Sequence, residues 1–265
     1  MFQTIVKIFL LVIITAAITP FIRKLAFVLG AVDNPNARRI NKKPMPTIGG
    51  LAIFVAFNIG EFVLLRKDFP THELFSVLLA SSVIILTGLI DDILELKPRQ
   101  KMFGIFVASL VVYFLAGIKV RELSLPFLGH IQLGWWSFPL TIFWILALTN
   151  AVNLIDGLDG LATGVTLISL VTMGIVGFFF LKSWQHYVPI MCIMLAACLL
   201  GFLPYNFHPA KIFLGDTGAL YIGFMISVLS LKGLKNVTFV SLLVPILILG
   251  VPITDTVYAM IRRKL

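Results

Sequence analysis

The sequence predicts an all-α protein, a polytopic bundle of about nine transmembrane helices, and two observations support this fold class. Of its 265 residues, 59% are hydrophobic and only 12% are charged, with a mean hydropathy of +1.04. Soluble domains carry roughly 25% charged residues, so lipid must be the main solvent of this chain. The apolar runs are also long and uninterrupted, whereas the strands of a transmembrane β-barrel would alternate in polarity.

A helix needs about 20 apolar residues to cross the hydrocarbon of a bilayer, and it satisfies its own backbone groups there. The apolar runs predict spans at residues 3–22, 48–65, 74–90, 102–118, 136–154, 161–181, 188–204, 217–231 and 238–260. The eighth run is short, and the fourth contains two glycines. We interpret the first as a retained span, because neither a basic leader nor a small-residue cleavage site accompanies it.

The distribution of lysine and arginine predicts that the N-terminus lies outside and the C-terminus is cytoplasmic, because basic residues gather in cytoplasmic loops. Under this topology every polar cluster that suggests chemistry faces the cytoplasm; the clusters are residues 33–50, 91–101, 150–160 and 206–218. The chain shows no long linker, low-complexity stretch or repeat. The sequence therefore predicts one helical domain.

The net charge of +9 does not indicate a nucleic-acid partner, because no basic stripe is interleaved with exposed aromatic residues. Anionic lipid headgroups and phosphorylated substrates are the expected partners. Cys192 and Cys198 lie six residues apart in an apolar run and form no metal-binding pattern. We expect both to be packed hydrophobic residues.

Asp91 and Asp92 close the third predicted span, and Glu95 follows shortly after. Adjacent carboxylates at the end of an apolar helix are costly unless a cation offsets their charge. Carboxylate oxygens are also the ligands that hard cations such as Mg²⁺ prefer. The pair therefore indicates a catalytic base or a magnesium site, and the plainer interpretation is a solvated helix end.

Residues 150–162 combine Asn150, Asn153, Asp156 and Asp159 with two glycines. The first three recur at three-residue spacing, which places them near one face of a continuing helix. Glycine permits close approach of the backbone to a ligand, or a break in the helix. The run is typical of recognition of a polar ligand at the membrane edge. The alternative is a capped turn between two helices.

Residues 205–218 end in Gly-Asp-Thr-Gly immediately before the eighth predicted span. This order places Asp216 near a helix N-terminus, where an acid serves either as a simple cap or as part of a site. Phe213 is either an aromatic residue that stacks on a nucleobase or an ordinary packing residue. His208 lies beside this cluster and indicates little on its own.

The first predicted cytoplasmic loop, residues 33–50, holds four cations within six residues. They either set the topology or capture phosphate, for which lysine and arginine are the usual residues. Phosphoryl transfer requires neutralised oxygens, positioning and a metal more than covalent work by the protein. A basic loop and several acids facing one aqueous surface fit that requirement.

Together these residues resemble the polyprenyl-phosphate N-acetylhexosamine-1-phosphate transferases, glycosyltransferase family 4. The similarity extends along nearly the whole chain and is carried by residues 46–50, the Asp91-Asp92 pair, residues 150–162 and residues 205–218. It implies a Mg²⁺-dependent phosphotransferase, with Mn²⁺ as a substitute, in the plasma membrane. Its partners would be a UDP-sugar and a polyprenyl phosphate lipid, its active face would be cytoplasmic, and a homodimer is one expected assembly.

The resemblance implies a role for four of the acids. Asp216 is similar to the family's principal magnesium ligand, and Asp91, Asp92 and Asp159 would lie near the metal and phosphates as catalytic residues. Asp91 would deprotonate or orient the lipid phosphate. The lipid phosphate would attack the sugar-linked phosphorus and release UMP. The residues do not distinguish direct attack from a route through a covalent enzyme intermediate.

The resemblance also implies six substrate-binding residues, which are Lys42, Thr47, Asn153, Asp156, Asn206 and Phe213. The lysine would contact the diphosphate, and the threonine would lie close to it. The two asparagines and the aspartate would belong to the nucleotide site, and the phenylalanine would stack on uracil.

Within that family, residues 32–36 followed by Arg38-Arg39 are most similar to the branch that uses UDP-N-acetylglucosamine and undecaprenyl phosphate to start wall teichoic acid and related polymers. The sister branch, an alternative, transfers phospho-N-acetylmuramoyl-pentapeptide and usually has Gly-Thr where this chain has Pro44-Met45. The family normally continues with a cytoplasmic His-x-His-His loop and further spans, whereas this sequence ends at Leu265. We therefore expect residues 1–265 to form a single transferase domain without that loop and those spans.

Two alternatives come from other functional classes. An ion-coupled transporter would place its acids near the bilayer midplane, at broken helices. The acids of this sequence lie at the ends of the predicted spans and on one predicted side of the membrane, which favours catalysis at the membrane surface. The other alternative is an inactive membrane scaffold.

Overall fold

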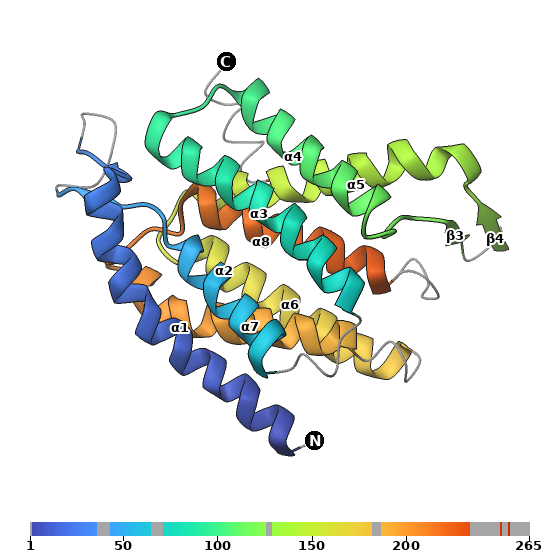
Figure 1. Ribbon diagram of the computed structural model, residues 1–265, viewed down its shortest axis with the longest axis horizontal. Coiled ribbons are helices and arrows are strands. Elements are labelled where there is room, and N and C mark those ends of the chain that lie inside the picture. The colour runs from blue at the N-terminus through green and yellow to red at the C-terminus, as the bar shows by residue number, and fades with distance from the viewer. Residues whose placement is uncertain are drawn as a thin grey trace.

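The computed structural model describes residues 2–35, 43–64, 71–125, 129–181 and 187–233, together with Gly250 and Thr254. The helices are α1 (Phe2–Leu29), α2 (Gly50–Ile59), α3 (Thr71–Leu94), α4 (Pro98–Phe114), α5 (Ser137–Ile155), α6 (Leu161–Phe180), α7 (Tyr187–Asn206) and α8 (Gly215–Gly233) (Figure 1). A π-helical turn (Gly60–Leu64) extends α2, and a 3-10 turn (Gly134–Trp136) precedes α5. The described chain is therefore mainly helical, as predicted.

Two short antiparallel strand pairs accompany the helices. Strand β1 (Val32–Asp33) pairs with β2 (Met45–Pro46), so that Val32 faces Pro46. Strand β3 (Glu122–Leu125) pairs with β4 (Gly129–Gln132) in a hairpin that extends away from the helices beyond one end of α5 (Figure 1). Strand β2 of the first pair lies directly before Thr47.

The helices coincide with the first eight predicted spans. Five are long and apolar enough to cross a membrane, and the Gly50–Val63 segment is apolar but shorter. The chain is therefore a multi-pass membrane protein. The ninth predicted span, 238–260, lies outside the described residues apart from Gly250 and Thr254. The number of nine spans and their orientation stay predictions.

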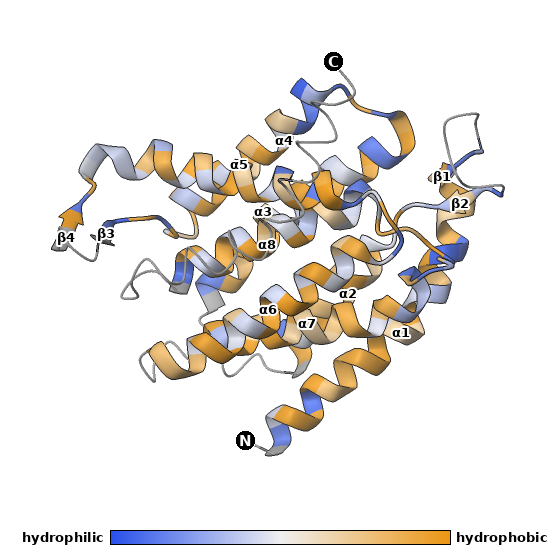
Figure 2. Cartoon of the chain, turned by 180° about the vertical axis from the view of Figure 1, so that it is seen from behind, coloured by the Kyte–Doolittle hydropathy of each residue, from blue (hydrophilic) through white to orange (hydrophobic). Residues whose placement is uncertain are grey.

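The surface of the helices is strongly apolar, as lipid contact requires. Phe21 and Val28 on α1 are 70% and 82% exposed, and Phe179 on α6 is 81% exposed. Figure 2 shows hydrophobic residues along the length of α1, α6 and α7, whereas hydrophilic residues gather near helix ends and in connecting segments. A contiguous apolar surface of this extent would aggregate in water.

Helix α1 runs further than its predicted span, which ended at residue 22. It continues through Arg23 and Lys24, whose side chains are exposed, to Leu29. Charged side chains of this length can extend from an apolar helix into polar surroundings. The apolar run therefore located the helix, but it did not define where the helix ends.

Helix α8 lies at the centre of the bundle. Every residue from 217 to 232 is buried, and α8 packs against α2, α3 and α5, with further contacts to α6 and α7 (Figure 1). A helix that is apolar on all sides is expected to be surrounded by other elements. The residues at the start of α8 are consequently placed where several helices meet.

Glycines allow α8 to approach its neighbours closely at its first turn. A Cβ atom on Gly50 of α2 would collide with Gly218, and a Cβ on Gly88 of α3 would lie 2.5 Å from Thr217 Cα. Small residues permit such close backbone contacts between membrane helices. The start of α8 is thereby held between α2 and α3, and Asp92, about one turn after Gly88, faces it.

Candidate active site

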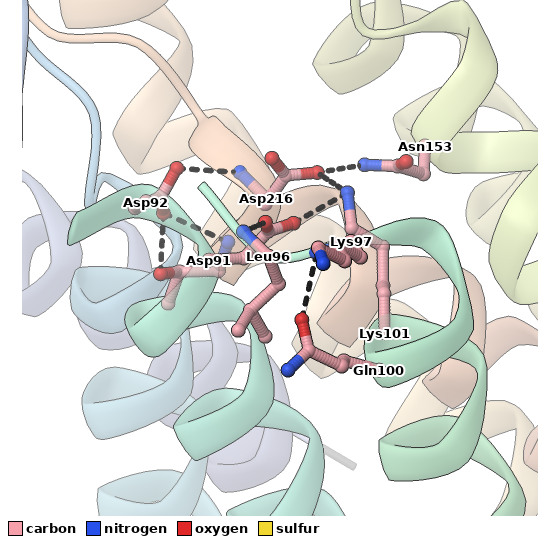
Figure 3. A network of polar contacts seen from close by, with 9 residues as sticks. Asp91, Asp92, Leu96, Lys97, Gln100, Lys101, Asn153 and Asp216 are labelled. Atoms are coloured by element: carbon pink, nitrogen blue, oxygen red, sulfur yellow. Dashed lines mark hydrogen bonds and ion pairs between the residues drawn. The ribbon is translucent and has the colours of Figure 1, made fainter. Parts of the chain in front are cut away.

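The carboxylate of Asp92 caps the N-terminus of α8. Its Oδ1 accepts a hydrogen bond from the Asp216 backbone N at 3.0 Å, and its Oδ2 accepts from Thr217 N at 3.0 Å and Thr217 Oγ1 at 2.6 Å (Figure 3). The first amides of a helix have no partner within the helix, and an acid from elsewhere can satisfy them. Asp92 therefore positions Asp216 through its backbone.

Gly215 makes this arrangement possible. Its φ of +71° lies in the left-handed region, and a Cβ atom there would collide with the carbonyl oxygen of Thr47. Thr47 itself is held by the residue directly before β1, because its N and Oγ1 both donate to Ala31 O at 3.1 Å. Only glycine satisfies both the conformation and the close contact.

Lys101, from the first turns of α4, lies between two carboxylates. Its Nζ forms ion pairs with Asp91 Oδ2 and, at 2.8 Å, with Asp216 Oδ1 (Figure 3). Asp91 is 5% exposed, Lys101 18% and Asp216 31%. The other oxygen of Asp91 accepts from Leu96 N at 2.8 Å. This cation supplies the charge that the acidic pair needs at the end of an apolar helix.

The amide of Asn153, near the end of α5, donates from Nδ2 to Asp216 Oδ1 (Figure 3). Asn150, one turn earlier, does not reach this carboxylate, because its Nδ2 donates to Leu146 O at 2.7 Å. Three elements, α4, α5 and α8, thus contribute polar groups to one point. Of the two asparagines of the run, Asn153 contacts Asp216, while Asn150 bonds to its own helix and to Met102 Sδ.

Asp156 is the C-cap of α5, and it interacts electrostatically with the carboxylates of Asp216 and Asp92. Burial raises its pKa to about 8, and the negative charges of Asp216 and Asp92 contribute to the increase. The side chain is partly buried. Burial is the larger cause of the raised pKa, and the two neighbouring carboxylates add a negative field in which a bound cation would be favourable.

Asp159 belongs to the loop between α5 and α6 and contacts the loop between α7 and α8. Its Oδ2 accepts from Ala210 N at 3.1 Å and lies 3.1 Å from His208 Nδ1. Asp159 is 26% exposed and His208 81%. These contacts bring the polar clusters 150–160 and 206–218 together, with Asp159 as their link.

Two further predicted site residues, Asn206 and Phe213, belong to the chain that leads from the end of α7 to α8. Asn206 is buried, its Oδ1 accepts from Thr163 Oγ1 at 2.7 Å, and its Nδ2 donates to Ile212 O at 3.2 Å. The backbone of Phe213 joins β2 through Pro46 O at 2.8 Å. Its side chain is half-buried. Lys42 lies outside the described residues.

The oxygen donors suit Mg²⁺ in one specific sense. Among the described residues, no group of three or more His, Cys, Asp or Glu side chains is arranged to enclose a metal ion. Mg²⁺, however, is commonly bound through one or two carboxylates together with substrate phosphates and water. Asp216 and Asp91 already share one cation, Lys101, which shows that their oxygens converge on a position favourable to positive charge.

Three contacts of this centre were not predicted from the sequence. They join Lys101 to Asp91 and Asp216, Thr217 to Asp92, and Gly215 to Thr47. The cost of an uncompensated acidic pair was a usable signal that a nearby cation must contact it. No sequence signal pointed to Lys101 among the cations of that loop.

The arrangement can hold a phosphorylated ligand at one end of an apolar bundle. An ammonium group and amide donors lie beside carboxylates that can bind a cation or accept a proton. Phosphoryl transfer uses such groups for positioning and charge neutralisation. Surrounding apolar helices would let a lipid-linked reactant reach the same place.

Comparison with known proteins identifies similar chains. The family model described as glycosyl transferase family 4 matches residues 74–234. A probable undecaprenyl-phosphate N-acetylglucosaminyl 1-phosphate transferase of Bacillus subtilis is 44% identical over 94% of this chain and 68% of its own length. A phospho-N-acetylmuramoyl-pentapeptide-transferase of Clostridium botulinum is 34% identical over 92% and 75%. A decaprenyl-phosphate N-acetylglucosaminephosphotransferase of Mycolicibacterium smegmatis is 33% identical over 95% and 68%.

Proposed function

Because the chain belongs to glycosyl transferase family 4, we propose that it transfers N-acetylglucosamine 1-phosphate from UDP-N-acetylglucosamine to undecaprenyl phosphate and releases UMP. The observation that carries this proposal is the convergence of Asp91, Lys101 and Asp216 from three helices at one end of an apolar bundle. The 44% identity to the Bacillus subtilis transferase supports the choice of sugar and lipid.

Each side chain of this site has a separate role, which follows from its position. Lys101 neutralises phosphate oxygens, and Asp91 orients or deprotonates the phosphate of the lipid. Asp92 holds the first turn of α8, so that the Asp216 carboxylate keeps its place beside Asn153. The lipid phosphate oxygen attacks the phosphorus attached to the sugar, a new P–O bond forms, and the bond to the UMP oxygen breaks.

Mg²⁺ is part of this proposal, with Asp216 as its principal protein ligand and Asp91 nearby. When bound, it would neutralise charge on the diphosphate. The protein contributes the fixed carboxylates, while Asn153 and Lys101 restrain Asp216 in the free state. Lys101 would then turn from Asp216 toward the phosphate oxygens, for which its flexible side chain is suited.

We further propose that this end of the bundle faces the cytoplasm, where UDP-sugars are present. The basic residues of the loops on that side support the orientation. Transfer to undecaprenyl phosphate would be the first membrane step in making wall teichoic acid or a related surface polymer. Residues 1–265 would act as one domain.

A second candidate reaction is transfer of phospho-N-acetylmuramoyl-pentapeptide, favoured by the 34% identity to the Clostridium botulinum enzyme. Purified protein would be given undecaprenyl phosphate, Mg²⁺ and either radiolabelled UDP-N-acetylglucosamine or labelled UDP-N-acetylmuramoyl-pentapeptide. We expect labelled lipid and UMP only from the first donor. Product from the second donor alone would show that UDP-N-acetylmuramoyl-pentapeptide is the substrate. Ion-coupled uptake into vesicles without UMP release would show that the protein is a transporter and not a transferase.

A further inference from the structure

The contact between Asp159 and His208 joins two loops that are distant in sequence. A carboxylate accepts hydrogen bonds and donates none, so the hydrogen between the two groups is on His208 Nδ1. The same Asp159 oxygen also accepts from Ala210 N, and the two distances are both 3.1 Å. One carboxylate oxygen therefore holds both a side chain and the backbone of the facing loop.

Apolar and buried contacts support the same junction. A Cβ atom on Gly160 would lie 3.3 Å from the Phe207 ring, so the two loops touch through these residues. Behind them, Thr163 donates to Asn206 at 2.7 Å. The loops are thus docked by several contacts, among which the His208 imidazole is the outermost.

Both loops lead to the proposed active site. The loop between α5 and α6 begins with Asp156, and the loop between α7 and α8 ends at Leu214, two residues before Asp216 in the first turn of α8. The second loop is fixed at its far end, where Phe213 N donates to Pro46 O and Gly49 N donates to Phe213 O. His208 and Asp159 fix its near end.

We propose that His208 is a positioning residue, which holds the α5–α6 loop against the α7–α8 loop through Asp159 and thereby raises the affinity for the nucleotide sugar. The inference rests on the proposed function of this site. With 81% exposure, the imidazole adds little to the core, so its effect is expected in loop order and not in folding. Loops that are ordered before binding lose less entropy when the ligand arrives.

Three variants separate the hydrogen bond from the rest of the ring. In His208→Asn, the amide nitrogen occupies nearly the place of Nδ1 and can donate to Asp159. In His208→Gln, the amide nitrogen is displaced toward the place of Nε2, and His208→Ala has no donor. We expect the His208→Ala and His208→Gln variants to bind UDP-N-acetylglucosamine about threefold to tenfold more weakly, the effect of losing one hydrogen bond. The affinity of the His208→Asn variant should stay within about twofold of that of the native chain.

Two readouts test the claim. Michaelis constants should follow the binding constants while kcat changes little, because the lost interaction is the same in ground and transition states. Hydrogen exchange measured without substrate should show faster exchange at the Ala210 amide in the Ala and Gln variants. Equal exchange and equal affinity in all variants would overturn the positioning role.

The same measurements separate this inference from the proposed function. If the native chain neither binds UDP-N-acetylglucosamine nor releases UMP, the proposed function fails, and with it the effect on nucleotide affinity. Hydrogen exchange at Ala210 then still decides whether His208 holds the two loops together. If the native chain is active but His208→Asn binds the nucleotide sugar as weakly as His208→Ala, the proposed function stands and the proposed role of the Nδ1 donor is wrong.

Discussion

Thr217 donates two hydrogen bonds to the same oxygen of Asp92, one from its backbone N at 3.0 Å and one from its hydroxyl at 2.6 Å. The two residues lie on different helices and are far apart in sequence. Their contact joins the end of α3 to the start of α8, and it thereby places Asp216 beside Lys101 and Asn153. The geometry of the site depends on this junction.

The first prediction concerns that junction. Thr217→Val keeps the shape of the fully buried side chain but removes the hydroxyl donor. We expect the free energy of unfolding to fall by about 1 kcal/mol. In a protein that already carries Asp92→Asn, Thr217→Val should lower the free energy of unfolding by clearly less, because the acceptor of the hydrogen bond has already been weakened. Thermal unfolding in detergent measures both effects, and strictly additive losses would refute the coupling.

The second prediction compares two glycines with positive φ. Gly215 (+71°) has no room for a Cβ because of Thr47 O, whereas Gly117 (+63°) has open space around it. Gly117→Ala should lower the free energy of unfolding by only about 1 kcal/mol, the conformational cost. Gly215→Ala should lower the melting temperature further and abolish UMP release. Equal effects would show that the close contact is unimportant.

Lys101 provides a third prediction. Lys101→Met should leave Asp91 and Asp216 without their shared cation, lowering the free energy of unfolding by about 1–3 kcal/mol, the cost of leaving a partly buried acceptor unsatisfied. UMP release should fall at least about tenfold because phosphate charge is no longer neutralised. Lys97→Met is the control, since Lys97 is exposed and close in sequence. Full activity in Lys101→Met would remove the lysine from the site.

The sequence predicted much of this architecture, because long apolar runs locate membrane helices directly. It also predicted that the polar clusters lie at one end, and the contacts Asp92–Thr217 and Asn153–Asp216 bring three of them together. The roles of these residues in binding substrate and metal stay predictions.

Other features could not be read from the chain. Tertiary contacts decide which of the three cations Lys97, Arg99 and Lys101 meets the acidic pair, and no local pattern distinguishes them. The need for glycine at position 215 arises from a carbonyl of a distant loop, at Thr47. His208 gave little signal because its partner, Asp159, lies 49 residues away in sequence.

A fourth prediction concerns pH. The pKa of Asp156 is raised to about 8 by burial and by the charges of Asp216 and Asp92, so the folded protein favours its protonated form. Its contribution to stability is complete below the ordinary aspartate pKa, about 4, and is lost progressively as the pH rises to about 8. The native chain should therefore lose stability across this window relative to Asp156→Asn, by at most about 1.4 kcal/mol per pH unit.

Melting temperatures of both proteins, measured without divalent cations between pH 5 and 9, test this prediction. The difference between the two proteins isolates Asp156 from other titrating groups. Parallel curves would show that Asp156 ionises normally. Adding Mg²⁺ should reduce the difference, because a nearby cation favours the ionised carboxylate.

The most direct test of the account is UMP release by Asp216→Asn, measured with UDP-N-acetylglucosamine, undecaprenyl phosphate and Mg²⁺. This change keeps the shape of the side chain and removes the charge on which Lys101, Asn153 and the proposed metal converge. Glu122→Gln, an exposed residue of the hairpin, is the matched control and should release UMP at the native rate. We predict that Asp216→Asn lowers release at least about 100-fold. Native, Mg²⁺-dependent release by that variant would contradict the account.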